Sequence, residues 1–423
     1  MKRRVVITGM GIVSPNGVGI LTFLKNIRSG VSGIRHFPKL TELNFSCQLG
    51  AQPEVPETLQ KQYFTDLELR NFNSNGILYG VMAGMDALAD AGINVAEKEG
   101  EPLWDLGVVF GTGTSGVEKF REAIYKLDDG NVRRLGSTTV IQTMASGISA
   151  YLGGKIGAGN WVTTNSSACA TGTEAVLMGY DHIANGKAEQ MLCGSCSDAS
   201  PYVWGGFDAM KVTTFKHNDT PKQASRPMSA SASGFVPGSG AGAVLLESLE
   251  SAQKRGATIY TEVLGGSSNN GGQRLGGSMT APNSKAVQKC ITDAIRNAQI
   301  TSRELDYLNG HLTATAKDPT EIANWCEALG RKGKDFPYIN SLKAMIGHGL
   351  AASGSMEIIS TVLQLQHGFV FPNINCEDLH PEISELIDRE KVPQEEIEVP
   401  LKTAAKASFG FGDVNACIIF RKI

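Results

Sequence analysis

Short apolar runs alternate with longer segments of helical periodicity along the whole chain, and this alternation restricts the fold more than any other feature. Runs of branched apolar residues predict strands at residues 4–8, 106–110, 188–194, 243–247, 258–264, 306–309, 337–340, 402–408 and 414–421. The intervening segments predict helices at residues 18–30, 73–91, 137–152, 248–256, 284–297, 319–329 and 350–367. Alternation of this kind is typical of mixed α/β layers.

Two features suggest that the chain consists of two related halves. Its 423 residues are enough for two domains. The polar helix predicted at 248–256 marks a seam, which gives halves of residues 1–250 and 251–423. In addition, Asn165-Ser166 and Asn340-Ser341 each follow a predicted strand and precede a small-residue turn and a helix. An internal duplication would produce such an echo.

Composition argues against several classes of protein. A net charge of −3 does not favour nucleic acid as a partner. No apolar run has the length of a membrane span, and the N-terminus turns polar too early for a signal peptide, so we expect a cytoplasmic protein without a membrane partner. Eight dispersed cysteines fit a reducing compartment. Cys193 and Cys196 form a CxxC pair without a second ligand pair, so we predict no metal site.

Two glycine-rich stretches resemble nucleotide-binding loops only in part. Residues 9–14 follow the first predicted strand, but Ser14 replaces the third glycine of a dinucleotide fingerprint. Residues 111–116 lack the Gly-Lys-Ser/Thr ending of a phosphate loop. We therefore predict no nucleotide cofactor.

The stretch from Asn165 to Ala175 places a single cysteine, Cys169, among small residues between a β-type run and a helical run. A helix N-terminus stabilises a negative charge by about 0.3–1 kcal/mol, and by up to about 2 kcal/mol when partly buried. Because one pKa unit corresponds to about 1.4 kcal/mol, we expect a thiol pKa of about 7–8 and a candidate nucleophile. The alternative is that Cys169 is a small buried apolar residue.

Two histidines lie directly after predicted strands, where a loop histidine with a purely solvated role would not be expected twice. His311 is followed by hydroxyl side chains and then by Asp318 and Glu321 at a helix start. His348 follows Lys343 by five residues and leads into another helix. These residues are candidates for chemistry together with Cys169.

The segment Ser408-Phe409-Gly410-Phe411-Gly412 is predicted to be a flexible turn. It could be a tight β-connection with two core phenylalanines. It could also supply a backbone N–H donor to an oxyanion, with an aromatic side chain as a gate.

Taken together, these stretches resemble the β-ketoacyl-acyl carrier protein synthases of the thiolase superfamily, most closely the elongating type II enzymes. The resemblance runs from Val5 to Phe420 in the family's order and spacing. The motifs that carry it are Val6-Ile7-Thr8-Gly9-Met10-Gly11, Ala168-Cys169, Arg226-Pro227 before Gly234-Phe235-Val236, His311, Lys343-Ala344-Met345-Ile346-Gly347-His348, and Ser408-Phe409-Gly410-Phe411-Gly412. It implies duplicated βαβαβαββ halves, a five-layered α/β/α/β/α core, usually a homodimer, and no cofactor.

The resemblance also implies a decarboxylative Claisen condensation, an acyltransferase reaction in fatty acid or polyketide synthesis. Cys169 would accept an acyl group from acyl carrier protein, and malonyl carrier protein would then lose carbon dioxide and attack the thioester. His311 and His348 would hold the enolate. The other implied roles are an oxyanion site at the N–H groups of Cys169 and Phe409, gating by Phe409, electrostatic tuning of the histidines by Lys343, and structural support by Asp318 and Glu321, with Glu321 as the partner of Lys343.

Several positions depart from the family's pattern. Leu312 replaces a glycine after His311, and Asp318 comes one position early, so that loop should be shorter and stiffer. Ser233 and Ser239 stand where acids are common, and Asp413-Val414 replace Gly-Thr. We expect an acyl pocket that includes Thr114, Phe207 and Phe411, and a specialised acyl substrate of a polyene or polyketide pathway.

Three alternatives stay open from the sequence. A non-condensing, chain-length-factor-like subunit of a heterodimer usually lacks the cysteine that is present here. A degradative thiolase would carry a second catalytic cysteine near the C-terminal glycine turn, where this chain has Phe409 and Phe411. A hydrolase with a nucleophile elbow is disfavoured because no G-x-S-x-G motif occurs.

Overall fold

The computed structural model describes residues 2–423, and a large sheet forms its centre. The strands of this sheet are β1 (Val5–Ser14), β2 (Gly17–Val18), β5 (Leu106–Thr112), β6 (Val162–Thr163), β7 (Gln190–Ser197), β8 (Gly240–Ser248), β9 (Thr261–Asn270), β10 (Tyr307–Asn309), β11 (Tyr338–Asn340), β14 (Thr403–Gly410) and β15 (Val414–Arg421). Their order is β11-β10-β14-β15-β9-β1-β8-β7-β5-β6, with β2 paired to β1 at one side.

The order and direction of these strands show the predicted duplication. In the first half, β1, β8 and β7 are antiparallel neighbours, and β7, β5 and β6 are parallel. In the second half, β9, β15 and β14 are antiparallel neighbours, and β14, β10 and β11 are parallel. The two halves meet through a short antiparallel pairing of Val5–Ile7 with Thr261–Val263. Each half therefore repeats the same five-stranded arrangement.

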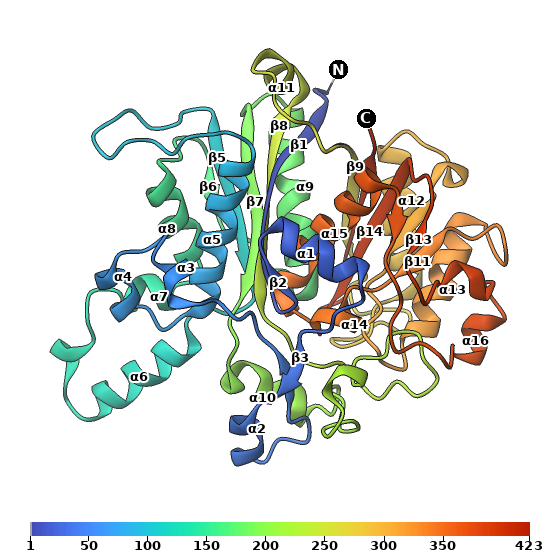
Figure 1. Ribbon diagram of the computed structural model, residues 1–423, viewed down its shortest axis with the longest axis horizontal. Helices are drawn as coiled ribbons and strands as arrows, with labels where there is room; N and C mark the ends of the chain where they lie inside the picture. Colours follow the sequence, from blue (N-terminus) through green and yellow to red (C-terminus); the bar gives the residue numbers. More distant parts are fainter. Residues whose placement is uncertain (1) are drawn as a thin grey trace.

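Helices cover both outer faces of the sheet and fill the space between its halves, as Figure 1 shows. On the first half, α5 (Asn75–Asp90) and α8 (Gly147–Ile156) form one outer layer. On the second half, α12 (Ser284–Asn297) and α13 (Asp318–Leu329) form the other. Between the halves lie α9 (Thr171–Ala184) and α15 (Ser353–His367), which contact strands of both. The five-layered α/β/α/β/α arrangement is thus confirmed.

The two central helices approach so closely because glycines face each other at their N-termini. A Cβ atom on Gly172 would lie 2.4 Å from the backbone nitrogen of Ser355, and one on Gly354 would lie 2.6 Å from that of Thr173. Each helix is preceded by a 3-10 turn, Ala168–Ala170 before α9 and Leu350–Ala352 before α15. The first residue of both turns has a positive φ, 46° at Ala168 and 52° at Leu350. The duplication therefore extends to the turns that precede the central helices.

The remaining elements surround this core. They are α1 (Ile20–Arg28), β3 (Ile34–His36), α2 (Pro38–Glu42), β4 (Leu49–Ala51), α3 (Glu57–Gln60), α4 (Asp66–Asn71), α6 (Val117–Asp128), α7 (Thr139–Thr143), α10 (Pro201–Ala209), α11 (Leu249–Lys254), α14 (Lys343–Ile346), β12 (Phe369–Val370), α16 (Pro381–Ser384) and β13 (Ile397–Glu398). Among residues 2–423, no helix has the length and apolar character that crossing a membrane requires.

Several sequence-based boundaries were wrong. The first strand was predicted to end before the glycines, but β1 continues to Ser14. Gly9 and Gly11 are needed there because a Cβ atom on either would lie within about 2.1 Å of a carbonyl oxygen of α5. The helix predicted over 137–152 is two helices, and residues 350–352 form a 3-10 turn. The predicted turn at 408–412 begins later, because Ser408–Gly410 belong to β14.

Candidate active site

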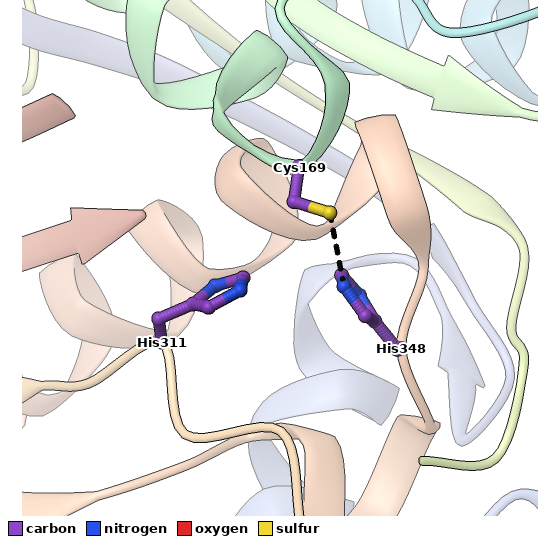
Figure 2. A group of neighbouring side chains, drawn as sticks. All are labelled: Cys169, His311 and His348. Atoms are coloured by element: carbon purple, nitrogen blue, oxygen red, sulfur yellow. Dashed lines mark hydrogen bonds between the residues drawn. The ribbon is translucent and has the colours of Figure 1, made fainter. Parts of the chain in front are cut away.

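The structure brings together Cys169, His311 and His348 from three segments that are far apart in the chain. One ligand-type atom of each lies within 4.8 Å of the others. Cys169 is in the 3-10 turn before α9, His311 follows β10, and His348 follows α14. Figure 2 shows both imidazole rings near the thiol. Nε2 of His348 lies 3.2 Å from Sγ of Cys169.

The same three side chains are the one group of possible metal ligands found among residues 2–423. A cysteine and two histidines are donors that zinc accepts. However, both ring nitrogens of His348 already have hydrogen-bond partners within the site.

The surroundings of His348 fix the position of its proton. The backbone N–H of Leu350 donates to Nδ1 over 3.2 Å, so Nδ1 is an acceptor. In a neutral imidazole the proton then lies on Nε2, the nitrogen that faces Sγ of Cys169. Burial, together with the positive charges of Lys343 and Lys406, holds the pKa of His348 well below its usual value. His348 is therefore a neutral hydrogen-bond donor at physiological pH.

His311 is held through its backbone, whereas its ring is left available. Its N–H donates to Oε1 of Glu321 over 2.7 Å, and Nζ of Lys343 donates to its carbonyl oxygen over 2.6 Å. Nδ1 of the ring is buried and makes no hydrogen bond with any of residues 2–423. Burial, followed by the charges of Lys343, His348 and Lys406, lowers the pKa of His311 well below its usual value.

The carboxylate partner of Lys343 is Glu357 of α15, not Glu321 as the sequence-based interpretation proposed. Nζ of Lys343 forms an ion pair and hydrogen bond with Oε1 of Glu357. Both side chains are buried, with 1% and 0% of their side-chain surface exposed. Glu357 was missed, although it is the one acidic residue in α15. A lone acid within a buried helix requires a cation nearby.

Asp318 and Glu321 shape the loop after His311. Oδ1 and Oδ2 of Asp318 accept the N–H groups of Thr313 and Ala314 over 2.9 and 3.1 Å. Glu321 also accepts the N–H of Leu312 over 2.7 Å. Burial raises the pKa of Asp318 to about 6 and that of Glu321 to about 7, although these hydrogen bonds oppose the shift. Both acids therefore act on backbone groups, as structural support requires.

The expected pKa of 7–8 for Cys169 was wrong. Cys169 is only 7% exposed, and burial raises the pKa of its thiol to about 11. The charge of Lys343 and a hydrogen bond from the backbone N–H of Phe411 oppose this shift but do not cancel it. In this site the desolvation of a thiolate outweighs the helix-terminus effect on which the prediction was based.

A cavity of about 590 Å³ opens from these three residues. Phe409 and Phe411 line it, together with exposed Lys211 and Lys317. Of the predicted pocket residues, only Phe411 lines this cavity. The ring of Phe207 packs near that of Phe411, with centroids 5.9 Å apart, and Thr114 is exposed and does not line the cavity.

The departure from the family pattern at Asp413 has a structural role. Asp413 is fully buried, and its carboxylate accepts the N–H groups of Gln273 and Asn283 over 2.9 and 2.8 Å. The adjacent N–H of Gly412 donates to the carbonyl of Met279 over 2.8 Å. Gln273 and Asn283 belong to the loop between β9 and α12. Residues 275–276 and 280–282 of this loop line the cavity. Asp413 thus ties the loop to the turn that carries Phe411.

Comparisons with known proteins agree with this geometry. Residues 2–252 match the family model described as "Beta-ketoacyl synthase, N-terminal domain", and residues 260–377 match "Beta-ketoacyl synthase, C-terminal domain". The chain is 34% identical to the 3-oxoacyl-[acyl-carrier-protein] synthase 2 of Vibrio harveyi, over 100% of this chain and 99% of that protein.

Two solved structures are similar over the whole length of both chains. One is a β-ketoacyl synthase from Burkholderia phymatum STM815, with a TM-score of 0.90 and 28% identity. The other is a complex of a type II polyketide acyl-carrier protein with its ketosynthase bound to the hexaketide, with a TM-score of 0.88 and 28% identity. The chain therefore belongs to the β-ketoacyl synthase family of condensing acyltransferases.

Proposed function

We propose that this protein condenses an acyl group held on Cys169 with malonyl carrier protein and releases carbon dioxide. The observation that carries the proposal is the convergence of one thiol and two neutral histidines at the end of a cavity. Covalent catalysis of this kind divides carbon–carbon bond formation into two simpler steps.

In the first step, Sγ of Cys169 attacks the thioester of the acyl carrier protein. A new thioester forms on Cys169, the carrier's carbon–sulfur bond breaks, and the proton of Cys169 leaves with the carrier's thiol. Because the pKa of Cys169 is about 11, little thiolate is present at rest. The N–H at Nε2 of His348, 3.2 Å from Sγ, stabilises the sulfur as its negative charge develops.

In the second step, the malonyl carboxylate leaves as carbon dioxide, and its electron pair passes to the α-carbon and the thioester oxygen. His311 and His348 donate hydrogen bonds to that oxygen, since both are neutral. The carbanion then attacks the acyl carbon, the thioester bond to Cys169 breaks, and the released thiolate takes a proton from solvent, which restores the thiol. The backbone N–H groups of Cys169 and Phe409 bind the intermediate oxyanion, and donors of this kind are typically worth a factor of about 10²–10³ each.

Two further residues have supporting roles in this proposal. Lys343 positions His311 through its carbonyl oxygen, 2.6 Å from Nζ. Phe409 is 6% exposed, with its ring centroid 6.2 Å from that of His311, and it gates the cavity between the two half-reactions. No metal or nucleotide takes part in these steps.

The substrate is proposed to be a specialised acyl chain of a polyketide or polyene pathway. Leu312 keeps a positive φ of 25°, a backbone conformation that glycine favours, but adds a buried apolar side chain directly after His311. The loop held by Asp413 reshapes the other side of the cavity. Similarity to a type II polyketide ketosynthase supports this choice. Rapid turnover of ordinary saturated acyl carriers of six to fourteen carbons would contradict it.

The partner is proposed to be an acidic acyl carrier protein that docks beside Lys211 and Lys317 at the cavity. We also propose that the protein is a homodimer located in the cytoplasm. Its Cys-bearing and His-bearing halves are proposed to meet near residue 250. Thr114 and Phe207 stay predicted pocket residues. A chain-length-factor-like role is not favoured, because the Cys169, His311 and His348 set is complete and assembled.

The test is the intact mass of the protein after incubation with a panel of acyl carrier proteins. We expect an acyl adduct that Cys169→Ala abolishes and that malonyl carrier protein removes as a product two carbons longer. The matched control is Cys47→Ala, since Cys47 is also a buried free thiol but lies outside the cavity. Absence of an adduct with every acyl group on the folded protein would refute the proposal.

A further inference from the structure

A second buried lysine, Lys406, lies next to the ion pair of Lys343 and Glu357. It comes from β14, three residues before Phe409, and its side chain is 0% exposed. Its Nζ lies 3.0 Å from Oε2 of Glu357. Nζ also donates a hydrogen bond to the carbonyl oxygen of Ala407 and another, of 3.1 Å, to Oγ of Ser408. One carboxylate therefore lies between two ammonium groups.

Two buried ammonium groups beside one carboxylate destabilise the core relative to apolar side chains. Burying an ammonium group costs several kcal/mol unless a counter-ion compensates it. Glu357 already compensates Lys343, and Glu321, the other acid that acts on Lys406, has a pKa raised to about 7. Burial, with repulsion from Lys343, lowers the pKa of Lys406. A methionine would fill the same space without a charge, so packing alone does not explain this lysine.

The charge of Lys406 acts on the catalytic histidines. It is one of the groups that lower the pKa values of His311 and His348. Lys406 is also connected to the nucleophile, since Oγ of Ser408 is 2.9 Å from Oγ1 of Thr173. Thr173 lies in α9, the helix that begins just after the turn of Cys169.

We propose that Lys406 is a second positioning residue of this active site, which keeps His311 and His348 neutral and stabilises the negative charge that develops on the enolate. The inference rests on the proposed function and deepens it. Neutrality matters at His348 because its Nδ1 must accept the N–H of Leu350. A protonated His348 would lose that hydrogen bond and the orientation that it fixes.

The consequence is a dependence on pH. The charged or titratable groups that face the two histidines are Lys343 from α14, Lys406 from β14, Glu357 from α15, Asp318 and Glu321 from α13, and Cys169. Removing Lys406 removes one cation from this set. The pKa values of both histidines then rise toward their ordinary value, and the acidic limb of the condensation rate moves to higher pH.

The test compares Lys406→Met with Lys402→Met, which removes the exposed lysine that directly precedes the same strand. For Lys406→Met we expect a thermal midpoint equal to or above that of the wild type, because Lys343 and Glu357 remain a balanced pair. We also expect the condensation rate of Lys406→Met to fall relative to the wild type on the acidic limb, by about tenfold for each pH unit that the limb moves, with a smaller effect on the loading of Cys169.

NMR of protein labelled at the imidazole carbons measures the histidine pKa values directly. This measurement does not require that the protein be active. Higher titration midpoints for His311 and His348 in Lys406→Met, and unchanged ones in Lys402→Met, would support the inference. Unchanged midpoints and an unchanged acidic limb would overturn it, and a lowered thermal midpoint with normal kinetics would assign Lys406 a purely structural role. A wild type that loads and condenses nothing would refute the proposed function instead, and the NMR comparison would still decide the role of Lys406.

Discussion

Replacing Glu357 by glutamine should destabilise the protein strongly, and by an amount that depends on pH. The side chains of Glu357 and Lys406 are 0% exposed, and that of Lys343 is 1% exposed. Glu357→Gln keeps the shape of the side chain but removes the carboxylate that forms ion pairs with both lysines. Two ammonium groups then lie buried beside a neutral amide.

The loss of stability that the charge of Lys406 can cause in Glu357→Gln has an upper limit, because Lys406 can release its proton. A buried ammonium without a counter-ion releases its proton once burial costs more than deprotonation. For a lysine with an ordinary pKa of about 10.4, deprotonation costs about 4.6 kcal/mol at pH 7 and about 1.9 kcal/mol at pH 9. Removing one partner of a buried ion pair costs about 3–5 kcal/mol. We therefore expect a loss of about 4 kcal/mol at pH 7 that falls to about 2 kcal/mol at pH 9.

The sign of the pH effect follows from proton linkage. In the variant, the pKa of Lys406 is lowered further in the folded state, so the unfolded chain binds more protons. The free energy of unfolding of the variant, relative to the wild type, must then rise with pH. Urea unfolding at pH 7, 8 and 9 measures this difference.

Glu247→Gln is the matched control for Glu357→Gln. Glu247 is also fully buried, but its partner Arg255 keeps 26% of its side-chain surface exposed. Arg255 can therefore be solvated when its partner is lost. For Glu247→Gln we expect a smaller loss of stability than for Glu357→Gln, and a loss that stays constant between pH 7 and 9. A loss below about 1 kcal/mol for Glu357→Gln at pH 7, or a loss that does not change with pH, would refute the reasoning.

Three further predictions concern single side chains. Because the pKa of Cys169 is about 11, its alkylation by iodoacetamide should still accelerate between pH 8 and about 10, and a plateau by pH 8 would contradict the raised pKa. Asp413→Ala should raise the hydrogen exchange of the N–H groups of Gln273 and Asn283 by about tenfold or more, whereas unchanged exchange would mean that Asp413 does not hold the loop. Glu321 has a folded pKa of about 7, above its unfolded value of about 4.3, so wild-type stability should fall as pH rises from about 5 to 7; Glu321→Gln should reduce this slope, and an equal slope in urea unfolding would contradict the assignment.

The layers of the fold were predictable because they depend on patterns that the sequence displays locally. Buried strands such as residues 106–110 and amphipathic helices such as 284–297 were placed within a few residues of their observed bounds. The glycines at positions 9 and 11 misled the interpretation, because glycine usually interrupts a strand. Their reason is tertiary, since α5 packs directly on β1 at that point.

The candidate site was predictable as a set of residues but not as a set of charges. Cys169, His311 and His348 stand out by type and position, and the structure brings them together. The partner of a buried ion depends on which side chains meet across the core. The sequence therefore could not show that Glu357 and Lys406 belong to the site. The pKa of Cys169 was missed for the same reason, because its burial comes from elements far away in the sequence.

The duplication explains why the thiol and the second histidine meet in a defined orientation. The two halves supply equivalent 3-10 turns, each beginning with a residue of positive φ, Ala168 in one and Leu350 in the other. In the first half this turn presents Cys169 at the N-terminus of a central helix. In the second half the same turn directs the N–H of Leu350 to Nδ1 of His348, and so leaves the proton on Nε2. Since Gly172 and Gly354 allow the two helix ends to approach closely, the geometry that places the nucleophile also aims the donor that stabilises it.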